Sequence, residues 1–214
     1  MKLFLDTADV SQIREAVGWG IIDGVTTNPS HIAKTGRSFA EVSRQILELV
    51  DGPVSLETVS LTCAEIVAEG KSLAALHPNV VVKVPLIKEG LKAVKRLSGE
   101  GIKTNVTVTF SPLQALLAAK CGATYISPFV GRLDAVGHRG MELVEQIKKI
   151  YTNYGFKTQV LAAAIRNPIH VLDAALAGAD VCTMSFDVVE QLYNHPLTDI
   201  GLELFLKDWG KVPR

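Results

Sequence analysis

Cysteine is scarce in this chain, and so is any surplus of charge. The three cysteines, Cys63, Cys121 and Cys182, lie far apart and form no CxxC pair, so neither a disulfide framework nor a zinc site is expected. Lysine and arginine number 22, aspartate and glutamate also number 22, and the formal net charge is zero. A nucleic-acid partner or an acidic tail is therefore not expected.

Long apolar runs are missing as well. No stretch approaches the roughly 20 apolar residues needed to cross a bilayer, and the apolar run MKLFLD stops at Asp6, unlike a signal peptide. We therefore expect no membrane partner and a cytoplasmic location. No low-complexity linker marks a domain boundary, and no G-x-G-x-x-G motif follows the first apolar run, which argues against a dinucleotide site.

Short β-branched segments alternate instead with longer segments of helical period. The expected strands cover residues 2–6, 24–28, 53–59, 79–85, 102–110, 124–130, 159–165 and 180–186. This alternation predicts a parallel sheet, and eight repeats favour a closed (β/α)₈ TIM barrel over an open doubly wound sheet. Residues 1–214 are expected to form a single domain, with an extra C-terminal helix over about residues 196–210.

The segment VVVKVP, residues 80–85, places a lysine within a strand that is otherwise typical of a buried position. Side chains alternate along a barrel strand between the interior and the helix layer. If Lys83 faces the interior, Val81 shares that face, whereas Val80, Val82 and Val84 face the helices.

The same alternation gathers polar side chains near the carboxyl ends of the strands, where active sites of such barrels lie. This inward set comprises Asp6, Thr26, Asn28, Glu57, Lys83, Asn105, Thr107 and Ser127. In the segment TNVTVT it places Asn105, Thr107 and Thr109 inside and Val108 outside. No metal is expected, because the set lacks a cluster of histidines or cysteines.

A lysine in such a site is suited to covalent chemistry. Desolvation favours the neutral amine, which attacks carbonyls and forms a Schiff base. The iminium accepts electrons when a neighbouring C–C bond breaks, and Asp6 and Glu57 are the available acid/base groups. The alternative is a structural ion pair between Lys83 and one of these carboxylates. The five histidines are interpreted as surface or core-edge groups: His31, His77, His138, His170 and His195.

The motifs FLDTAD, GVTTNPS, VSLE, VVKVP, KTNVTVTFS and ISPFVGRLD occur in this order, and IRNP follows. They resemble the small transaldolases, a subfamily that includes the closely related fructose-6-phosphate aldolases. The resemblance covers essentially the whole chain. It implies a class I mechanism on a (β/α)₈ barrel that needs no cofactor, with sugar phosphates as substrates and a place in the pentose phosphate pathway.

The resemblance also implies roles for individual residues. Lys83 becomes the Schiff-base lysine, Asp6 the acid/base for the substrate hydroxyl, and Glu57 acts through a water that Thr107 also holds. The remaining residues bind the substrate. They are Thr26, Asn28, Asn105 and Ser127 in the strand set, Phe129 beside them, and the phosphate-binding Arg132 and Arg166.

Two features bear on the branch of the family. The aldolase branch carries glutamine at the position of Glu57 and tyrosine at that of Phe129, so this chain resembles the transaldolase branch. A serine often stands two residues before the arginine of IRNP in the family, whereas this chain has Ala164. One phosphate contact is therefore expected to be missing.

The resemblance further implies a homo-oligomer, a decamer of two pentamers in which the C-terminal helix reaches a neighbour. Within that helix, Phe205 and Trp209 lie one turn apart on one face, and they could pack on the barrel or on another subunit. Two alternative functions remain open at this point. One is a lyase that cleaves fructose 6-phosphate, and the other is a non-catalytic barrel that binds sugar phosphates.

Overall fold

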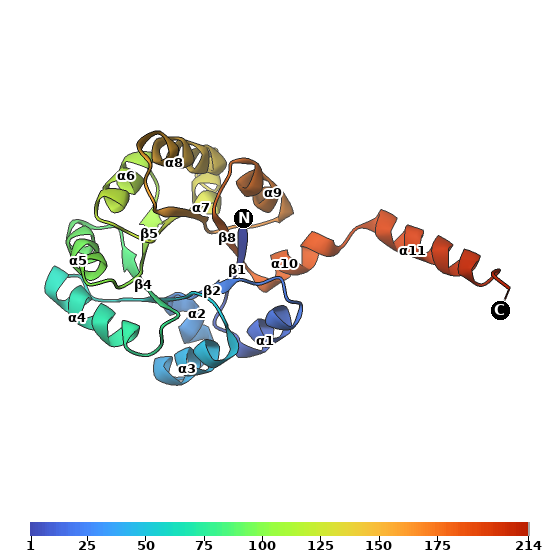
Figure 1. Ribbon diagram of the computed structural model, residues 1–214, viewed down its shortest axis with the longest axis horizontal. Coiled ribbons are helices and arrows are strands. Elements are labelled where there is room, and N and C mark those ends of the chain that lie inside the picture. Colours follow the sequence, from blue (N-terminus) through green and yellow to red (C-terminus); the bar gives the residue numbers. More distant parts are fainter. Residues whose placement is uncertain (214) are drawn as a thin grey trace.

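The computed structural model describes residues 1–213 and forms a closed barrel of eight parallel strands in sequence order (Figure 1). The predicted (β/α)₈ barrel is confirmed, and the open doubly wound sheet is excluded. Each predicted segment contains a strand, although most strands end before the predicted limit. The strands are β1 Lys2–Asp6, β2 Gly24–Thr26, β3 Val54–Glu57, β4 Val80–Pro85, β5 Thr104–Thr109, β6 Tyr125–Pro128, β7 Gln159–Ala162 and β8 Val181–Met184.

Helices α1 to α9 surround the barrel, and α10 leads out to α11, which extends away from it (Figure 1). The helices of the described chain are α1 Val10–Gly18, α2 Pro29–Lys34, α3 Phe39–Leu49, α4 Cys63–Ala74, α5 Lys88–Gly99, α6 Pro112–Lys120, α7 Val130–Asp134, α8 Gly140–Tyr154, α9 Pro168–Leu176, α10 Phe186–Tyr193 and α11 Pro196–Trp209.

The helix ends follow from local sequence signals. Asp9 caps α1 by accepting hydrogen bonds from the backbone N–H groups of the first turn. The Ser11 hydroxyl also donates to this carboxylate, and that bond is the main cause of the lowered pKa of Asp9. Ser111 and Gln114 form a capping box at the start of α6. Gly178, just beyond α9, takes a φ of +75°, which favours glycine.

Two apolar clusters hold the barrel together. The larger one lies between the strands and the helices and contains Val80, Val82 and Val84. The smaller one contains side chains from several strands, namely Phe4, Val81, Tyr125, Leu161, Ala163 and Val181, with Phe129 packed against it. This division confirms the predicted alternation along β4, in which Val81 lies apart from the other valines.

Strand β5 departs from the predicted alternation. Its pairing with β6 shifts register between Val106 and Thr109, and Val108 adopts a φ of +60° within this irregularity. A positive φ is unfavourable for a β-branched side chain. The sequence pattern predicted Val108 on the helix side. Because the register shifts here, Val108 instead lines the cavity at the mouth of the barrel.

Helix α11 contributes nothing to the core of its own barrel. None of its residues is buried, and the side chains of Phe205 and Trp209 are 75% and 73% exposed. The first of the two predicted packing modes, against the barrel, is therefore wrong for this subunit. None of the described helices has the length and apolar composition that crossing a membrane requires.

Candidate active site

A cavity of about 650 Å³ lies at the carboxyl ends of the barrel strands. Two of the predicted site residues, Asn105 and Thr107, do not line it but are fully buried on β5. The other predicted site residues all line this cavity, namely Asp6, Thr26, Asn28, Glu57, Lys83, Ser127, Phe129, Arg132 and Arg166.

The Lys83 side chain lies in the wall of this cavity and is only 5% exposed as a residue. Its Nζ is 3.0 Å from Glu57 Oε2 and donates a hydrogen bond of 2.8 Å to the Thr27 carbonyl oxygen. Glu57 and Lys83 are paired across strands β3 and β4, so the strand register itself brings the two groups together. The ion pair that the sequence left open is present, and it also places a proton acceptor beside the amine.

Asp6, at the end of β1, is held by hydroxyl groups of neighbouring strands. The Thr26 hydroxyl donates a hydrogen bond of 2.8 Å to Asp6 Oδ1 and lies 2.6 Å from the Thr183 hydroxyl. Because Thr26 gives its proton to Asp6, Thr183 donates to Thr26. This chain orients the carboxylate, and it includes Thr183, a cavity residue that the sequence analysis did not single out.

A second chain of hydrogen bonds crosses strands β3, β5 and β6. Ser127 donates to Asn105 Oδ1 at 2.7 Å, and Asn105 Nδ2 donates to the Ser55 hydroxyl at 3.2 Å. The two bonds determine which way the Asn105 amide points. Nearby on β5, the buried Thr107 hydroxyl has no hydrogen-bond partner among residues 1–213. Thr107 therefore has hydrogen-bonding capacity to offer at this end of the barrel.

His31 belongs to the site, although the sequence analysis interpreted it as scaffold. It lies in the first turns of α2, three residues after Asn28, whose Oδ1 caps this helix by accepting from the His31 N–H. The His31 Nδ1 is 3.2 Å from Asn28 Nδ2 and 3.7 Å from Asp6 Oδ1. Burial lowers the pKa of His31, and the Asp6 carboxylate opposes this shift in part. The three-residue spacing from Asn28 was the signal available in the sequence.

Cationic side chains lie across the cavity from His31. Arg132 is on α7 and Arg166 follows β7, and both line the cavity. Among the ion pairs found within residues 1–213, none involves either guanidinium group. Two arginines that are not neutralised by carboxylates form a suitable site for a phosphate group.

Comparison with known proteins agrees with this geometry. Residues 3–212 match the family described as Transaldolase/Fructose-6-phosphate aldolase. The chain belongs to this family. The match to the transaldolase/fructose-6-phosphate aldolase family thus covers nearly the whole barrel and all of the C-terminal helix α11.

Relatives within the family are similar over their full length. A protein of Aquifex aeolicus (strain VF5) named "Probable transaldolase" is 64% identical over 213 residues, which cover 100% of this chain and 98% of the relative. Another "Probable transaldolase", from Dictyoglomus turgidum, is 61% identical over 214 residues and 100% of both chains. A third relative with the same name, from Caldicellulosiruptor saccharolyticus, is 60% identical. These likenesses support an enzyme of the aldolase or transferase type with transaldolase-like activity.

Proposed function

We propose that the protein is a transaldolase that moves a dihydroxyacetone unit from a ketose phosphate to an aldose phosphate through a Schiff base at Lys83. One observation carries this proposal. The buried Lys83 amine lies against Glu57 in the wall of a cavity that also holds Asp6 and two arginines without carboxylate partners. A carbonyl nucleophile, two proton-transfer groups and a phosphate site thus share one cavity.

Formation of the imine begins with the transfer of a proton from the Lys83 ammonium to Glu57, 3.0 Å away. The neutral amine then attacks C2 of the ketose, and the carbinolamine loses its hydroxyl as water to give the iminium. Glu57 returns the proton needed for this loss, through a water that the Thr107 hydroxyl also binds. The buried Thr107 hydroxyl supports this assignment because it has no protein partner within residues 1–213.

Cleavage of the C3–C4 bond requires a base for the C4 hydroxyl. Asp6 takes this proton, the C4 oxygen becomes the aldehyde of the departing aldose phosphate, and the bonding electrons pass into the iminium to form an enamine. The acceptor aldehyde then reacts with the enamine, and Asp6 returns the proton to the new hydroxyl. The hydrogen bond from Thr26 keeps the Asp6 carboxylate in one orientation throughout.

The three-carbon unit is held by polar groups that the barrel already orients. Asn28 and Ser127 line the cavity and bind its hydroxyls, and Thr26 completes the wall on the side of Asp6. The fully buried Asn105 acts with them through its hydrogen bond to Ser127. The bond between Ser127 and Asn105 supports this role, because it fixes both groups before substrate arrives.

Arg132 and Arg166 bind the phosphate at the far end of the substrate. A guanidinium group presents several N–H donors in a planar fork that suits phosphate oxygens. Ala164 also lines this part of the cavity, but it has no hydroxyl to add to the contact.

Transfer is favoured over release of the three-carbon unit. The Phe129 ring lines the cavity and packs edge-on against Phe110, with 5.8 Å between the ring centroids. It presents no hydroxyl that would protonate or hydrolyse the bound enamine, so this intermediate waits for an acceptor aldehyde. Glu57 and Phe129 together support the transferase over the two alternatives, a fructose-6-phosphate lyase and a non-catalytic barrel.

The acceptor dependence of turnover distinguishes these functions. The protein is incubated with fructose 6-phosphate alone and then with added erythrose 4-phosphate. A transaldolase forms glyceraldehyde 3-phosphate and sedoheptulose 7-phosphate only in the second case. Release of free dihydroxyacetone without acceptor at a comparable rate would show the lyase, and absence of turnover in both cases would show a binding protein.

The same proposal includes a homo-oligomer, a decamer of two pentamers, in which α11 packs on a neighbouring subunit. Support comes from the exposed apolar side chains of α11, of which Phe205 and Trp209 are the largest. Exposed apolar side chains gathered on one projecting helix are typical of a surface that packs against another protein. A cytoplasmic location and a step in the pentose phosphate pathway complete the proposal.

A further inference from the structure

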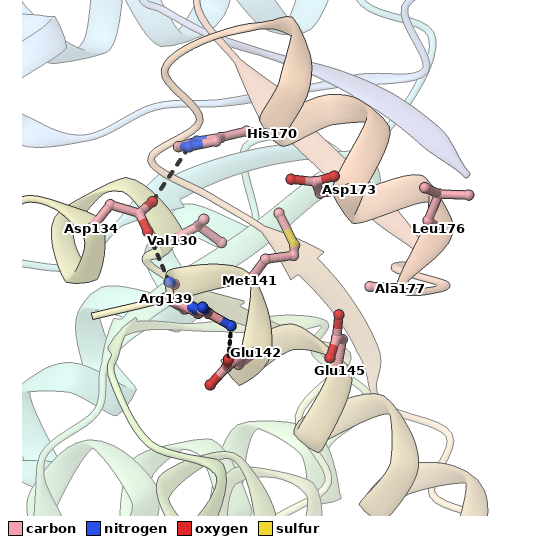
Figure 2. A pocket seen from close by; sticks show the side chains of 11 residues that line it. Val130, Asp134, Arg139, Met141, Glu142, Glu145, His170, Asp173, Leu176 and Ala177 are labelled. Atoms are coloured by element: carbon pink, nitrogen blue, oxygen red, sulfur yellow. Dashed lines mark hydrogen bonds and ion pairs between the residues drawn. The ribbon is translucent and has the colours of Figure 1, made fainter. Parts of the chain in front are cut away.

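His170 lies behind the proposed phosphate site and not in it. It is on the first turn of α9, where Asn167 caps the helix and accepts a hydrogen bond of 3.0 Å from the His170 N–H. Its side chain is 17% exposed and lines a cavity of about 590 Å³ between α7, α8 and α9 on the outer side of the barrel. Figure 2 shows its ring directed from α9 toward Asp134 on α7.

Both ring nitrogens of His170 contact other segments. The Nδ1 lies 3.4 Å from the backbone nitrogen of Arg166, and the Nε2 lies 3.4 Å from Asp134 Oδ2. A backbone N–H can only donate, so Nδ1 accepts and the ring proton is on Nε2, facing the carboxylate. The imidazole thus contacts the Arg166 backbone on one side and the Asp134 carboxylate on the other.

Asp134 extends this link to the next helix. Its Oδ1 accepts a hydrogen bond of 2.8 Å from the backbone of Gly140, at the start of α8 (Figure 2). Asp134 also lies two residues after Arg132 in the five-residue helix α7. Through one imidazole and one carboxylate, the backbone of Arg166 is therefore connected to the helix that carries Arg132.

The two arginine-bearing segments are already in close contact. The Gly131 N–H donates a hydrogen bond of 3.2 Å to the Ala164 carbonyl oxygen. A side chain at position 131 would collide with that oxygen and approach the Arg166 Cγ to 2.7 Å. Because the packing is so tight, a small shift of either segment would change the separation of the two guanidinium groups.

We propose that His170 is a positioning residue that holds the Arg166 backbone against the helix of Arg132, so that both guanidinium groups face one phosphate. The proposal rests on the phosphate-binding role given above to Arg132 and Arg166. It predicts that His170 governs the recognition of phosphorylated substrates and does not take part in the chemistry at Lys83.

The test uses the ratio of two KM values, one for glyceraldehyde 3-phosphate and one for unphosphorylated glyceraldehyde as acceptor. His170→Leu removes both ring contacts and should raise the KM of the phosphorylated acceptor about tenfold, with less than about a twofold change for glyceraldehyde. In His170→Asn the amide oxygen replaces Nδ1, and in His170→Gln the amide nitrogen replaces Nε2. Each of these variants should therefore recover part of the loss.

Asp134→Asn approaches the same link from the other side and preserves the shape of the side chain. Its single amide oxygen can serve either the Gly140 N–H or the His170 Nε2–H, but not both. The ratio should again shift against the phosphorylated acceptor. His138→Gln, which removes an exposed histidine in the α7–α8 connection, is the matched control and should leave the ratio as in the wild type.

The outcomes separate this inference from the proposed function. If Arg166→Gln changes the ratio but His170→Leu and Asp134→Asn do not, the positioning role of His170 is wrong and the phosphate site stands. If Arg166→Gln also leaves the ratio unchanged, the phosphate assignment itself fails, and the role of His170 fails with it. Equal losses with both acceptors in the His170 variants would likewise overturn the positioning role.

Discussion

The Nζ of Lys83 and the Oε2 of Glu57 lie 3.0 Å apart on neighbouring strands of the barrel. The Lys83 amine attacks a carbonyl only after it has lost its proton, and Glu57 is the carboxylate that the strand pairing places beside it. Glu57 is therefore the group that takes this proton when substrate enters. Glu57 is thus both the structural partner of Lys83 and the base that activates it.

Glu57→Gln tests this dual role. The amide retains the size of the side chain but cannot accept a proton, so imine formation and hydrolysis should slow and kcat should fall by about 10²-fold. Rapid mixing with fructose 6-phosphate, followed by quenching with borohydride, measures the rate at which the Lys83 adduct forms. Glu48→Gln, an exposed change on α3, is the control. An unchanged rate in Glu57→Gln would show that another group activates Lys83.

Phe129→Tyr should convert part of the transfer activity into release. The new hydroxyl enters the cavity where the enamine forms, and it can donate the proton needed to discharge the three-carbon unit. Free dihydroxyacetone from fructose 6-phosphate, measured without acceptor, should increase. Phe110→Tyr adds a hydroxyl to the other ring of the same aromatic pair, outside the lining of this cavity, and should not increase release. Equal release by both variants would contradict the assignment.

Ala164 combines a missing hydroxyl with an unfavourable backbone, because its φ is +56°. Ala164→Ser should lower the KM of phosphorylated substrates about threefold to tenfold by adding one hydrogen bond. Ala164→Gly relieves the backbone without adding a donor, so it should raise the free energy of unfolding by about 1 kcal/mol and leave this KM unchanged. Denaturant unfolding and steady-state kinetics of the two variants measure these effects separately. A gain in phosphate affinity in Ala164→Gly would assign the effect to backbone geometry.

The lowered pKa of His31 predicts a pH dependence of stability. Because the folded protein binds this proton less readily than the unfolded chain, stability is greatest above the ordinary pKa of 6.5 and is lost as pH falls through the folded value. His31→Gln has no such proton to bind. As the pH is lowered, the unfolding free energy of the variant should therefore fall less than that of the wild type. Denaturant unfolding across this range measures it. A difference that is independent of pH would contradict the lowered pKa.

Helix α11 should determine the oligomeric state. The double change Phe205→Glu and Trp209→Glu places charge on its exposed apolar surface and should disrupt assembly while each barrel stays folded, since no residue of α11 belongs to the core. Sedimentation velocity should show smaller species than in the wild type, and circular dichroism should be unchanged. Lys207→Glu, an exposed change in the same helix, is the charge control. An unchanged sedimentation coefficient in the double variant would refute this role of α11.

Features of the fold that depend on neighbouring residues in the chain could be predicted from the sequence, and those that depend on contacts between distant segments could not. The eight strands and the separation of Val81 from Val80, Val82 and Val84 follow from a two-residue period, which is a local property, and they were predicted. The orientation of Val108 was predicted wrongly, because an irregularity in the β5–β6 register shifts the alternation of side chains by one residue.

The site shows the same distinction. Position at a strand end identified Asp6, Glu57 and Lys83, since the carboxyl ends of all parallel strands meet at one mouth. The contribution of His170 arises from a contact between α9 and α7, which no spacing along the chain records. For His31 the spacing from Asn28 was available, but its contact with Asp6 on another strand was not.

The central claim is that Lys83 forms a covalent imine with the substrate, and borohydride reduction followed by peptide mass mapping tests it most directly. With fructose 6-phosphate present, the account predicts one added three-carbon unit on the peptide that contains Lys83, and no adduct in a Lys83→Met variant. A protein that turns over substrate while acquiring no adduct, or an adduct on another lysine, would contradict it.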